Sequence, residues 1–195
     1  MKQLRKWQKD AKECFREIIT KMSKSEDEKL VAVNACVGSG KTTVAFEAFI
    51  DYLDIHKPEK SIQMFVCPRI NLCNQQAADF KKEYEEEIAK YNITIAQWNC
   101  ESKDFTDRDI DTMWSSANAK NYVIFIVDES IWGTEEVQTK DNIKFNRSRF
   151  DEFNKKLDKA AELGFQFGVI TYDEAHNYQA NQEEMFGEAK YLEED

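Results

Sequence analysis

Residues 38 to 43 combine glycines with a serine, a lysine and two threonines, which are the residue types that bind phosphate groups. Glycines let the backbone turn so that successive N–H groups point at phosphate oxygens, and a helix that begins there adds a favourable dipole. Lys41 is expected to reach the β- and γ-phosphates, and the Thr42 hydroxyl is expected to bind Mg²⁺. The sequence therefore predicts a nucleoside triphosphate site, formed by Gly38, Ser39, Gly40, Lys41, Thr42 and Thr43.

Two apolar runs end in an Asp-Glu pair, which is the kind of group that phosphoryl transfer requires. One carboxylate holds the magnesium ion, and a second orients the attacking water. The first pair is Asp128 and Glu129, and the second is Asp173 and Glu174, within the run Asp-Glu-Ala-His. Either pair could serve. The longer signature favours Asp173 as the metal ligand and Glu174 as the residue that acts on the water.

Apolar runs and amphipathic segments alternate along the chain and predict the elements that position these residues. Short β-branched runs separated by helices indicate parallel strands in a doubly wound α/β sheet, with ligands at the carboxyl ends of the strands. A stripe that includes Trp7, Cys14 and Phe15 predicts an amphipathic first helix. The predicted strands are 30–35, 62–67, 93–98, 122–127 and 167–172, and the predicted helices are 4–22, 41–53, 71–90 and 148–163.

Composition narrows the class of protein. A chain of 195 residues, 42% of them hydrophobic, is expected to form one domain with a genuine core. A net charge of −10 argues against a protein that coats nucleic acid with a broad basic face. The sequence has neither a membrane span nor a signal-peptide core, so we expect a cytoplasmic protein. The five cysteines include no Cys-x-x-Cys pair and predict reduced, mostly buried thiols.

Together, these features resemble the N-terminal RecA-like lobe of superfamily 2 helicases, and most closely the DExH/DEAH-type branch of restriction subunits and phage helicases. The first motif of that family commonly begins with alanine, as at Ala35, and the second matches Asp173 to His176. The resemblance spans nearly the whole chain. It implies a RecA-like P-loop fold with helices on both faces of a mostly parallel sheet, and ATP and Mg²⁺ as ligands. It also implies DNA or RNA as a partner, and the cytoplasm of a bacterium or phage-infected host.

Further residues acquire roles from this resemblance. Gln8, in the segment Leu-Arg-Lys-Trp-Gln, is expected to recognise adenine, whereas Trp7 is expected to pack in the core. His176 is expected to make a polar contact near the γ-phosphate. Arg69, which stands where the family usually has threonine, and Ser130 are expected to contact the phosphates of a nucleic acid.

Family members continue beyond Asp-Glu-Ala-His to a Ser-Ala-Thr element and a second RecA-like lobe. That second lobe supplies an arginine finger, which is worth a factor of roughly 10³ to 10⁵ in rate. We therefore expect residues 1–195 to be a single RecA-like ATP-binding domain without its last strand and the second lobe. Alone it is expected to bind ATP and to hydrolyse it poorly, and to be completed by a longer protein or a partner subunit.

The leading interpretation is the motor lobe of an ATP-dependent DNA or RNA helicase or translocase. The alternative is a nucleotide-regulated module that binds nucleic acid or protein without motor activity of its own. An unrelated P-loop kinase or other nucleotide hydrolase is disfavoured by Asp-Glu-Ala-His and by the Leu-Arg-Lys-Trp-Gln segment. Residues 131–149 have no counterpart in the family. They are interpreted as a solvated insertion, or as a loop that touches nucleic acid through Lys140, Lys144, Arg147 and Arg149.

Overall fold

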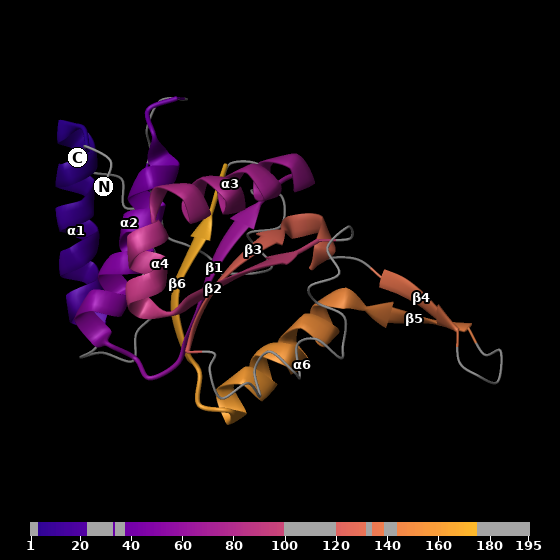
Figure 1. Cartoon of the computed structure of the whole chain (residues 1–195). Coiled ribbons are helices and arrows are strands. Elements are labelled where there is room, and N and C mark those ends of the chain that lie inside the picture. The colour runs from indigo at the N-terminus through magenta and orange to yellow at the C-terminus, as the bar shows by residue number, and fades with distance from the viewer. Residues whose placement is uncertain are drawn as a thin grey trace, which may run out of the picture.

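The computed structural model describes residues 4–22, 33, 38–99, 120–131, 134–138 and 144–174 (Figure 1). The predicted strand 30–35, apart from Val33, lies outside the described residues, as do Ala35 and His176. The described elements, in chain order, are α1 (Lys6–Met22), α2 (Lys41–His56), β1 (Ser61–Cys67), α3 (Ile70–Glu83), α4 (Glu85–Tyr91), β2 (Ile93–Trp98), β3 (Asn121–Val127), the 3-10 turn η2 (Asp128–Ser130), β4 (Thr134–Gln138), β5 (Lys144–Ser148), α6 (Arg149–Glu162) and β6 (Gln166–Tyr172).

Four strands form one parallel sheet in the order β2-β3-β1-β6. Each begins and ends within one residue of a strand that the sequence predicts. Every residue of β1 and β3 is buried, because α2 and α3 pack on one face of the sheet and α6 on the other (Figure 1). The predicted α/β fold is confirmed, and it is consistent with a RecA-like lobe.

β6 borders the described part of the sheet and is less covered than its neighbour β1. Its residues are partly exposed, and Ile170 reaches 50%. The pairing of β6 with β1 shifts in register between Ile62 and Met64, which marks a bulge. Beyond the bulge the pairing continues past the strand itself, because the backbone N–H of Asp173 donates to the carbonyl of Val66 at 2.9 Å.

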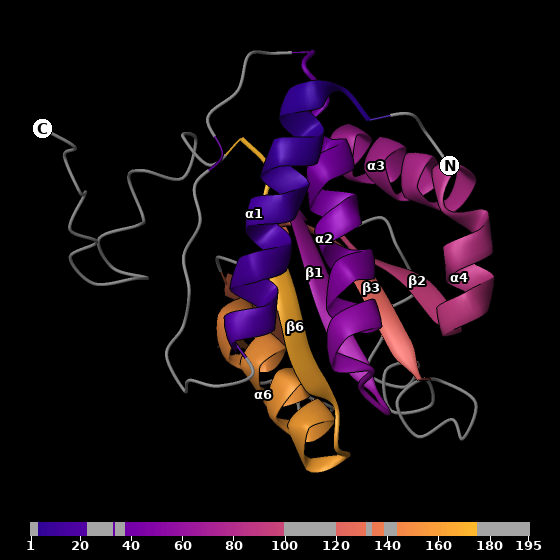
Figure 2. The same ribbon diagram turned by 90° about the vertical axis from the view of Figure 1, so that its left-hand side faces the viewer.

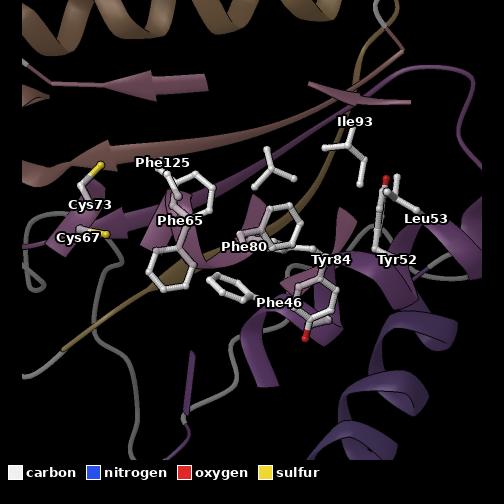
Figure 3. Packing of buried hydrophobic residues seen from close by; sticks show 14 of the residues in the cluster. Phe46, Tyr52, Leu53, Phe65, Cys67, Cys73, Phe80, Tyr84, Ile93 and Phe125 are labelled. Carbon is white, nitrogen blue, oxygen red and sulfur yellow. The ribbon is translucent and has the colours of Figure 1, made fainter. Parts of the chain in front are cut away.

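An aromatic cluster fixes α2 against the sheet. The ring of Phe46 on α2 lies 5.6 Å from that of Phe65 on β1 and 5.0 Å from that of Phe80 on α3 (Figure 3). Phe65 in turn lies 5.6 Å from Phe125 on β3. Truncating a buried phenylalanine typically costs about 3–5 kcal/mol. The cluster therefore holds the first residue of α2, Lys41, at a fixed place relative to the strands.

The helix predicted over 71–90 is divided into α3 and α4 at Tyr84, where the backbone leaves helical geometry with φ −122° and ψ 30°. The Tyr84 side chain is buried, and its hydroxyl donates to Glu47 Oε1 at 2.8 Å. Periodicity did not predict this break because it arises from a contact with α2, a distant part of the chain. Within the described residues, no helix is long and apolar enough to cross a membrane.

α1 lies alongside α2 (Figure 2), but the apolar stripe predicted for its buried face is only half-covered. Trp7, expected in the core, and Phe15 are half-buried, and Cys14 is exposed. Among the α1 side chains that the structure describes, the buried ones are Gln8 and Ile19. The predicted first helix is confirmed. The expectation that Trp7 packs in the core is not met, and the face of α2 toward α1 carries the carboxylates Glu47 and Asp51.

The segment between β3 and α6 contains an antiparallel hairpin. Strands β4 and β5 pair from Thr134 with Ser148 to Gln138 with Lys144. Figure 1 shows the hairpin projecting away from the parallel sheet. These strands lie in the segment 131–149, for which the sequence predicted only an insertion or a loop; residues 132–133 and 139–143 are outside the described part of the chain.

Candidate functional site

The loop before α2 adopts a conformation that its two glycines make possible. Gly38 and Gly40 have φ of +73° and +89°, in the left-handed region that side chains other than glycine rarely adopt. A Cβ added at Gly40 would lie 2.6 Å from Gln8 Nε2, so the end of the Gln8 side chain would have to move and would lose its contact with the loop, in addition to the strain of the positive φ. At Gly38 no atom lies within 4 Å of an added Cβ, so one side of the loop is open.

The loop contains a buried polar group that has no hydrogen-bond partner among the described residues. Gly40 is the N-cap residue of α2, and no side-chain hydrogen bond caps the described start of that helix. The amides of a first helical turn carry a partial positive charge and favour an anion. The Ser39 hydroxyl is buried and makes no hydrogen bond within the described residues. A buried hydroxyl without a partner is costly, and a phosphate oxygen is the type of acceptor that would satisfy it.

Two residues at the start of the chain hold this loop by its carbonyls. Gln8 is 5% exposed, and its Nε2 donates to the carbonyl of Gly40 at 3.0 Å. Arg5 Nη1 donates to the carbonyl of Ser39 at 3.2 Å. The N–H of Arg5 also donates to Gln8 Oε1 at 2.8 Å, which orients the Gln8 amide. The contact of Arg5 with the loop was not predicted, because it depends on how α1 packs in three dimensions.

The carboxylate of Asp173 lies within electrostatic reach of the Lys41 ammonium. Burial and the neighbouring Glu174 raise the pKa of Asp173 above its ordinary value, while the Glu174 N–H, which donates to Asp173 Oδ1 at 3.1 Å, and the charge of Lys41 lower it. The net effect on the pKa is upward, so burial outweighs the favourable contacts. A further positive charge, such as a divalent cation, would stabilise this carboxylate in its ionised form.

Glu174 leaves the strand through an unusual backbone conformation. Its φ of +53° is positive although it is not a glycine, and such residues carry a strain of about 1–3 kcal/mol. The turn breaks the alternation of a β-strand directly after Asp173. The two adjacent carboxylates therefore do not have to point to opposite faces of the sheet, which is the arrangement that divided metal and water roles require.

Arg69, Ser130 and Asp173 follow β1, β3 and β6 respectively. Because these strands are parallel neighbours, the three residues lie along one edge of the sheet. Arg69 is exposed and Ser130 is half-buried. The alternative carboxylate Asp128 also faces this edge, since its charge adds to burial in raising the pKa of Tyr172. The Glu129 side chain and His176 lie outside the described part of the chain.

Two buried thiols lie at the carboxyl end of β1 and in the helix that follows it. Cys67 ends β1 and Cys73 lies in the first turns of α3, as Figure 3 shows, and both side chains are fully buried. A hydrogen bond with Cys73, burial and the charge of Asp173 all raise the pKa of the Cys67 thiol. Cys67 is therefore a neutral, packed thiol, as expected from the sequence.

A parallel α/β sheet with a glycine-turned loop at a helix N-terminus, a lysine on that helix and a carboxylate at a strand end defines the class of P-loop nucleotide-binding lobes. Comparison with known families makes the assignment specific. Residues 1–193 match the family described as type III restriction enzyme, res subunit, and the chain belongs to that family. It is thus the N-terminal RecA-like lobe of a superfamily 2 helicase, an ATP-dependent helicase-type motor lobe. Comparisons with curated proteins and with solved structures gave no match.

Proposed function

We propose that this lobe binds Mg²⁺–ATP on the loop at residues 38–43 and, joined to a second lobe, couples ATP hydrolysis to movement along DNA or RNA. The family supports ATP and Mg²⁺ as ligands and nucleic acid as a partner in general. The observation that supports the proposal is that the charge of Lys41 lowers the pKa of Asp173, although the two residues are far apart in the sequence and Asp173 follows a strand of the sheet against which α2 packs. In the proposal, Lys41 is the phosphate-binding cation and Asp173 the metal-binding carboxylate of one site.

Each residue of the loop has a defined part in this proposal. The amides of Gly38, Ser39 and Gly40 bind the phosphates, assisted by the Ser39 hydroxyl, which makes no hydrogen bond among the described residues. Lys41 contacts the β- and γ-phosphates, and the Thr42 hydroxyl contributes to the Mg²⁺ shell. Thr43 is buried at the first turn of α2, where its N–H bonds to the Gly40 carbonyl at 3.2 Å and closes the loop.

The carboxylates of Asp173 and Glu174 have separate roles in this proposal. Asp173 binds the Mg²⁺ shell, and the ion supplies charge neutralisation for the phosphates when it is bound. Magnesium keeps several waters and needs only one or two protein carboxylates, so Asp173 together with the Thr42 hydroxyl would be a sufficient set of protein ligands. Glu174 orients the attacking water, and His176 contacts the γ-phosphate end.

Gln8 is proposed to recognise adenine. A side-chain amide has two N–H donors and two oxygen lone pairs. The contacts of Gln8 with Gly40 and Arg5 use one of each, so a donor and an acceptor remain for an adenine edge. This arrangement would connect the base to the phosphate loop through one side chain. Arg69 and Ser130, on the loops after β1 and β3, are proposed to contact nucleic-acid phosphates.

The test of the proposal uses the protein with its second lobe present. The expected result is ATP hydrolysis that DNA or RNA stimulates and that Lys41→Ala abolishes. If hydrolysis of ATP by the two-lobe protein were unaffected by any single- or double-stranded nucleic acid, the lobe would instead be the nucleotide-regulated binding module that is the alternative.

A further inference from the structure

A row of polar side chains on α1 faces a row of carboxylates on α2. Gln8, Lys12 and Arg16 are spaced four residues apart and therefore share one face of α1. Glu47 and Asp51 have the same spacing on α2, and both are buried, Asp51 to 2% exposure. Two buried carboxylates one turn apart repel each other, so their burial requires cations from a neighbouring element.

Those cations come from α1. Lys12 Nζ bonds to Glu47 Oε2 and lies 3.8 Å from Asp51 Oδ1. Arg16 binds two carboxylates, with Nη1 on Asp51 Oδ1 and Nη2 on Asp54 Oδ2 at 3.1 Å. We refer to Lys12, Arg16, Glu47, Asp51 and Asp54 as the ion-pair ladder.

The contacts between α1 and α2 follow the same order along both helices, so the helices run side by side in one direction (Figure 2). Gln8 contacts Gly40 at one end, the ladder follows, and His56 Nε2 lies 2.9 Å from the Ile19 carbonyl at the other end. A slide of α1 by one turn, about 5.4 Å, would move Gln8 away from Gly40. It could re-pair one cation, Lys12 with Asp51 or Arg16 with Glu47, but the other buried carboxylate would then face uncharged Gln8 or Thr20. The ladder therefore fixes the axial position of α1.

The ladder is better suited to setting position than to adding stability. Asp51 Oδ2 is buried without a hydrogen-bond partner among the described residues. Burial raises the pKa of Asp51 despite the opposing charges of Lys12 and Arg16. The pKa of Arg16 is also raised, first by its hydrogen bond to Asp54. Arg16 is exposed whereas Asp51 is buried, so the cost of burying the Asp51 carboxylate dominates the net benefit of the pair. Ion pairs buried at such cost contribute little net stability, but they disfavour other registers.

We infer that Lys12 and Arg16 are positioning residues for nucleotide binding, which hold α1 in the register that keeps Gln8 on the loop at residues 38–43. The inference rests on the proposed function, because it assumes that the loop binds Mg²⁺–ATP. Neither residue touches the loop itself. Their effect on the nucleotide is expected to pass through Gln8, and this dependence distinguishes positioning from general stabilisation.

The binding test is a double-mutant cycle on the full chain, with ribose-labelled fluorescent Mg²⁺–ATP as the probe. Arg16→Met keeps the apolar stem and removes the charge, and it is expected to weaken binding about tenfold, equivalent to about 1.4 kcal/mol. In the Gln8→Ala background the same change is expected to have less than a twofold effect. Arg16→Lys is expected to recover most of the affinity. The control is Lys21→Met, which removes the α1 lysine that lies 3.9 Å from Glu17 on the exposed surface.

Arg16→Met leaves Asp51 buried with a weakened partner set and could unfold the chain. The variant Arg16→Met/Asp51→Asn removes both charges and keeps the size of the side chain at position 51. It is expected to weaken binding of the probe to the same extent as Arg16→Met alone. A second measurement needs no nucleotide. Amide hydrogen exchange in residues 38–43 is expected to be faster in the ladder variants than in wild type or Lys21→Met, because the loop loses its contacts with Gln8 and Arg5.

The outcomes separate this inference from the function it rests on. If wild type binds no Mg²⁺–ATP, the proposed function fails, whereas the exchange experiment still decides whether the ladder positions the loop. If wild type binds the probe and Arg16→Met weakens probe binding equally in the wild-type and Gln8→Ala backgrounds, the ladder only stabilises the fold in general and the inference is overturned. Unchanged exchange in residues 38–43 would overturn it as well.

Discussion

Gln8 Nε2 occupies the space beside Gly40 that a side chain at position 40 would need: the two residues are hydrogen-bonded at 3.0 Å, and an added Cβ would approach Nε2 to 2.6 Å. The requirement for glycine in the phosphate loop therefore has a source outside the loop. The first helix and the loop are fitted to each other, so a change in either is expected to affect nucleotide binding.

Gly40→Ala is predicted to weaken Mg²⁺–ATP binding and to destabilise the chain by about 1–3 kcal/mol, because it forces a positive φ on alanine and displaces Gln8. Gly164→Ala is the matched control, since Gly164 also has a positive φ, of +85°, but an added Cβ there meets nothing within 4 Å. It is predicted to cost about 1 kcal/mol and to leave binding intact. Urea unfolding and nucleotide titration measure the two effects. Equal loss of binding in both variants would contradict the role of the Gln8 contact.

Lys41→Ala is predicted to reduce Mg²⁺–ATP affinity by about 10- to 150-fold, since a charge-assisted contact with the phosphates contributes about 1.5–3 kcal/mol. Its thermal stability is expected to change little, because the Lys41 side chain is only half-buried. Lys82→Ala, on an exposed position of α3, is the control. Isothermal titration calorimetry measures the affinity of both variants. If Lys41→Ala kept wild-type affinity, Lys41 would not be part of the nucleotide site.

Asp173→Asn is predicted to stabilise the nucleotide-free chain at neutral pH. The pKa of Asp173 in the folded chain is raised above the ordinary 3.8, so the folded state loses stability relative to the unfolded chain as pH rises from below 3.8 through the raised value. Asparagine does not ionise and avoids this loss. The midpoint of thermal unfolding should therefore be higher for the variant at pH 7, with a difference that shrinks as pH falls toward 4. A variant less stable than wild type at pH 7 would show that ionised Asp173 is favourable in the fold.

Glu174→Gln is predicted to retain bound ATP and to stop hydrolysis in the protein completed by its second lobe, because the glutamine cannot accept a proton from the attacking water. Glu129→Gln, the corresponding change in the other Asp-Glu pair, is expected to hydrolyse ATP normally. Single-turnover hydrolysis of bound ATP compares the two variants. Should the effects be exchanged, the catalytic carboxylate is at the end of β3 rather than β6.

Local patterns predicted much of this molecule. Buried strands such as β3, with its unbroken apolar run, were located within a residue, because burial on both faces excludes polar side chains. The loop at residues 38–43 could be proposed as a phosphate site because that chemistry depends on adjacent residues, and its role stays a prediction. The Tyr84 break and the Lys12–Glu47 pair were not predicted, because each depends on which helix packs against which. Only the spacing of four between Lys12 and Arg16, and between Glu47 and Asp51, could have suggested two complementary helix faces.

The central claim is that Lys41 and Asp173 belong to one Mg²⁺–ATP site, and the dependence of ATP affinity on Mg²⁺ tests it most directly. Affinity is measured for wild type and Asp173→Asn with excess Mg²⁺ and with a chelator. Wild type is predicted to bind ATP at least about tenfold more tightly with Mg²⁺, and Asp173→Asn is predicted to lose most of that difference while still binding metal-free ATP. If Asp173→Asn keeps the full Mg²⁺ dependence of wild type, the carboxylate does not serve this site and the account is contradicted.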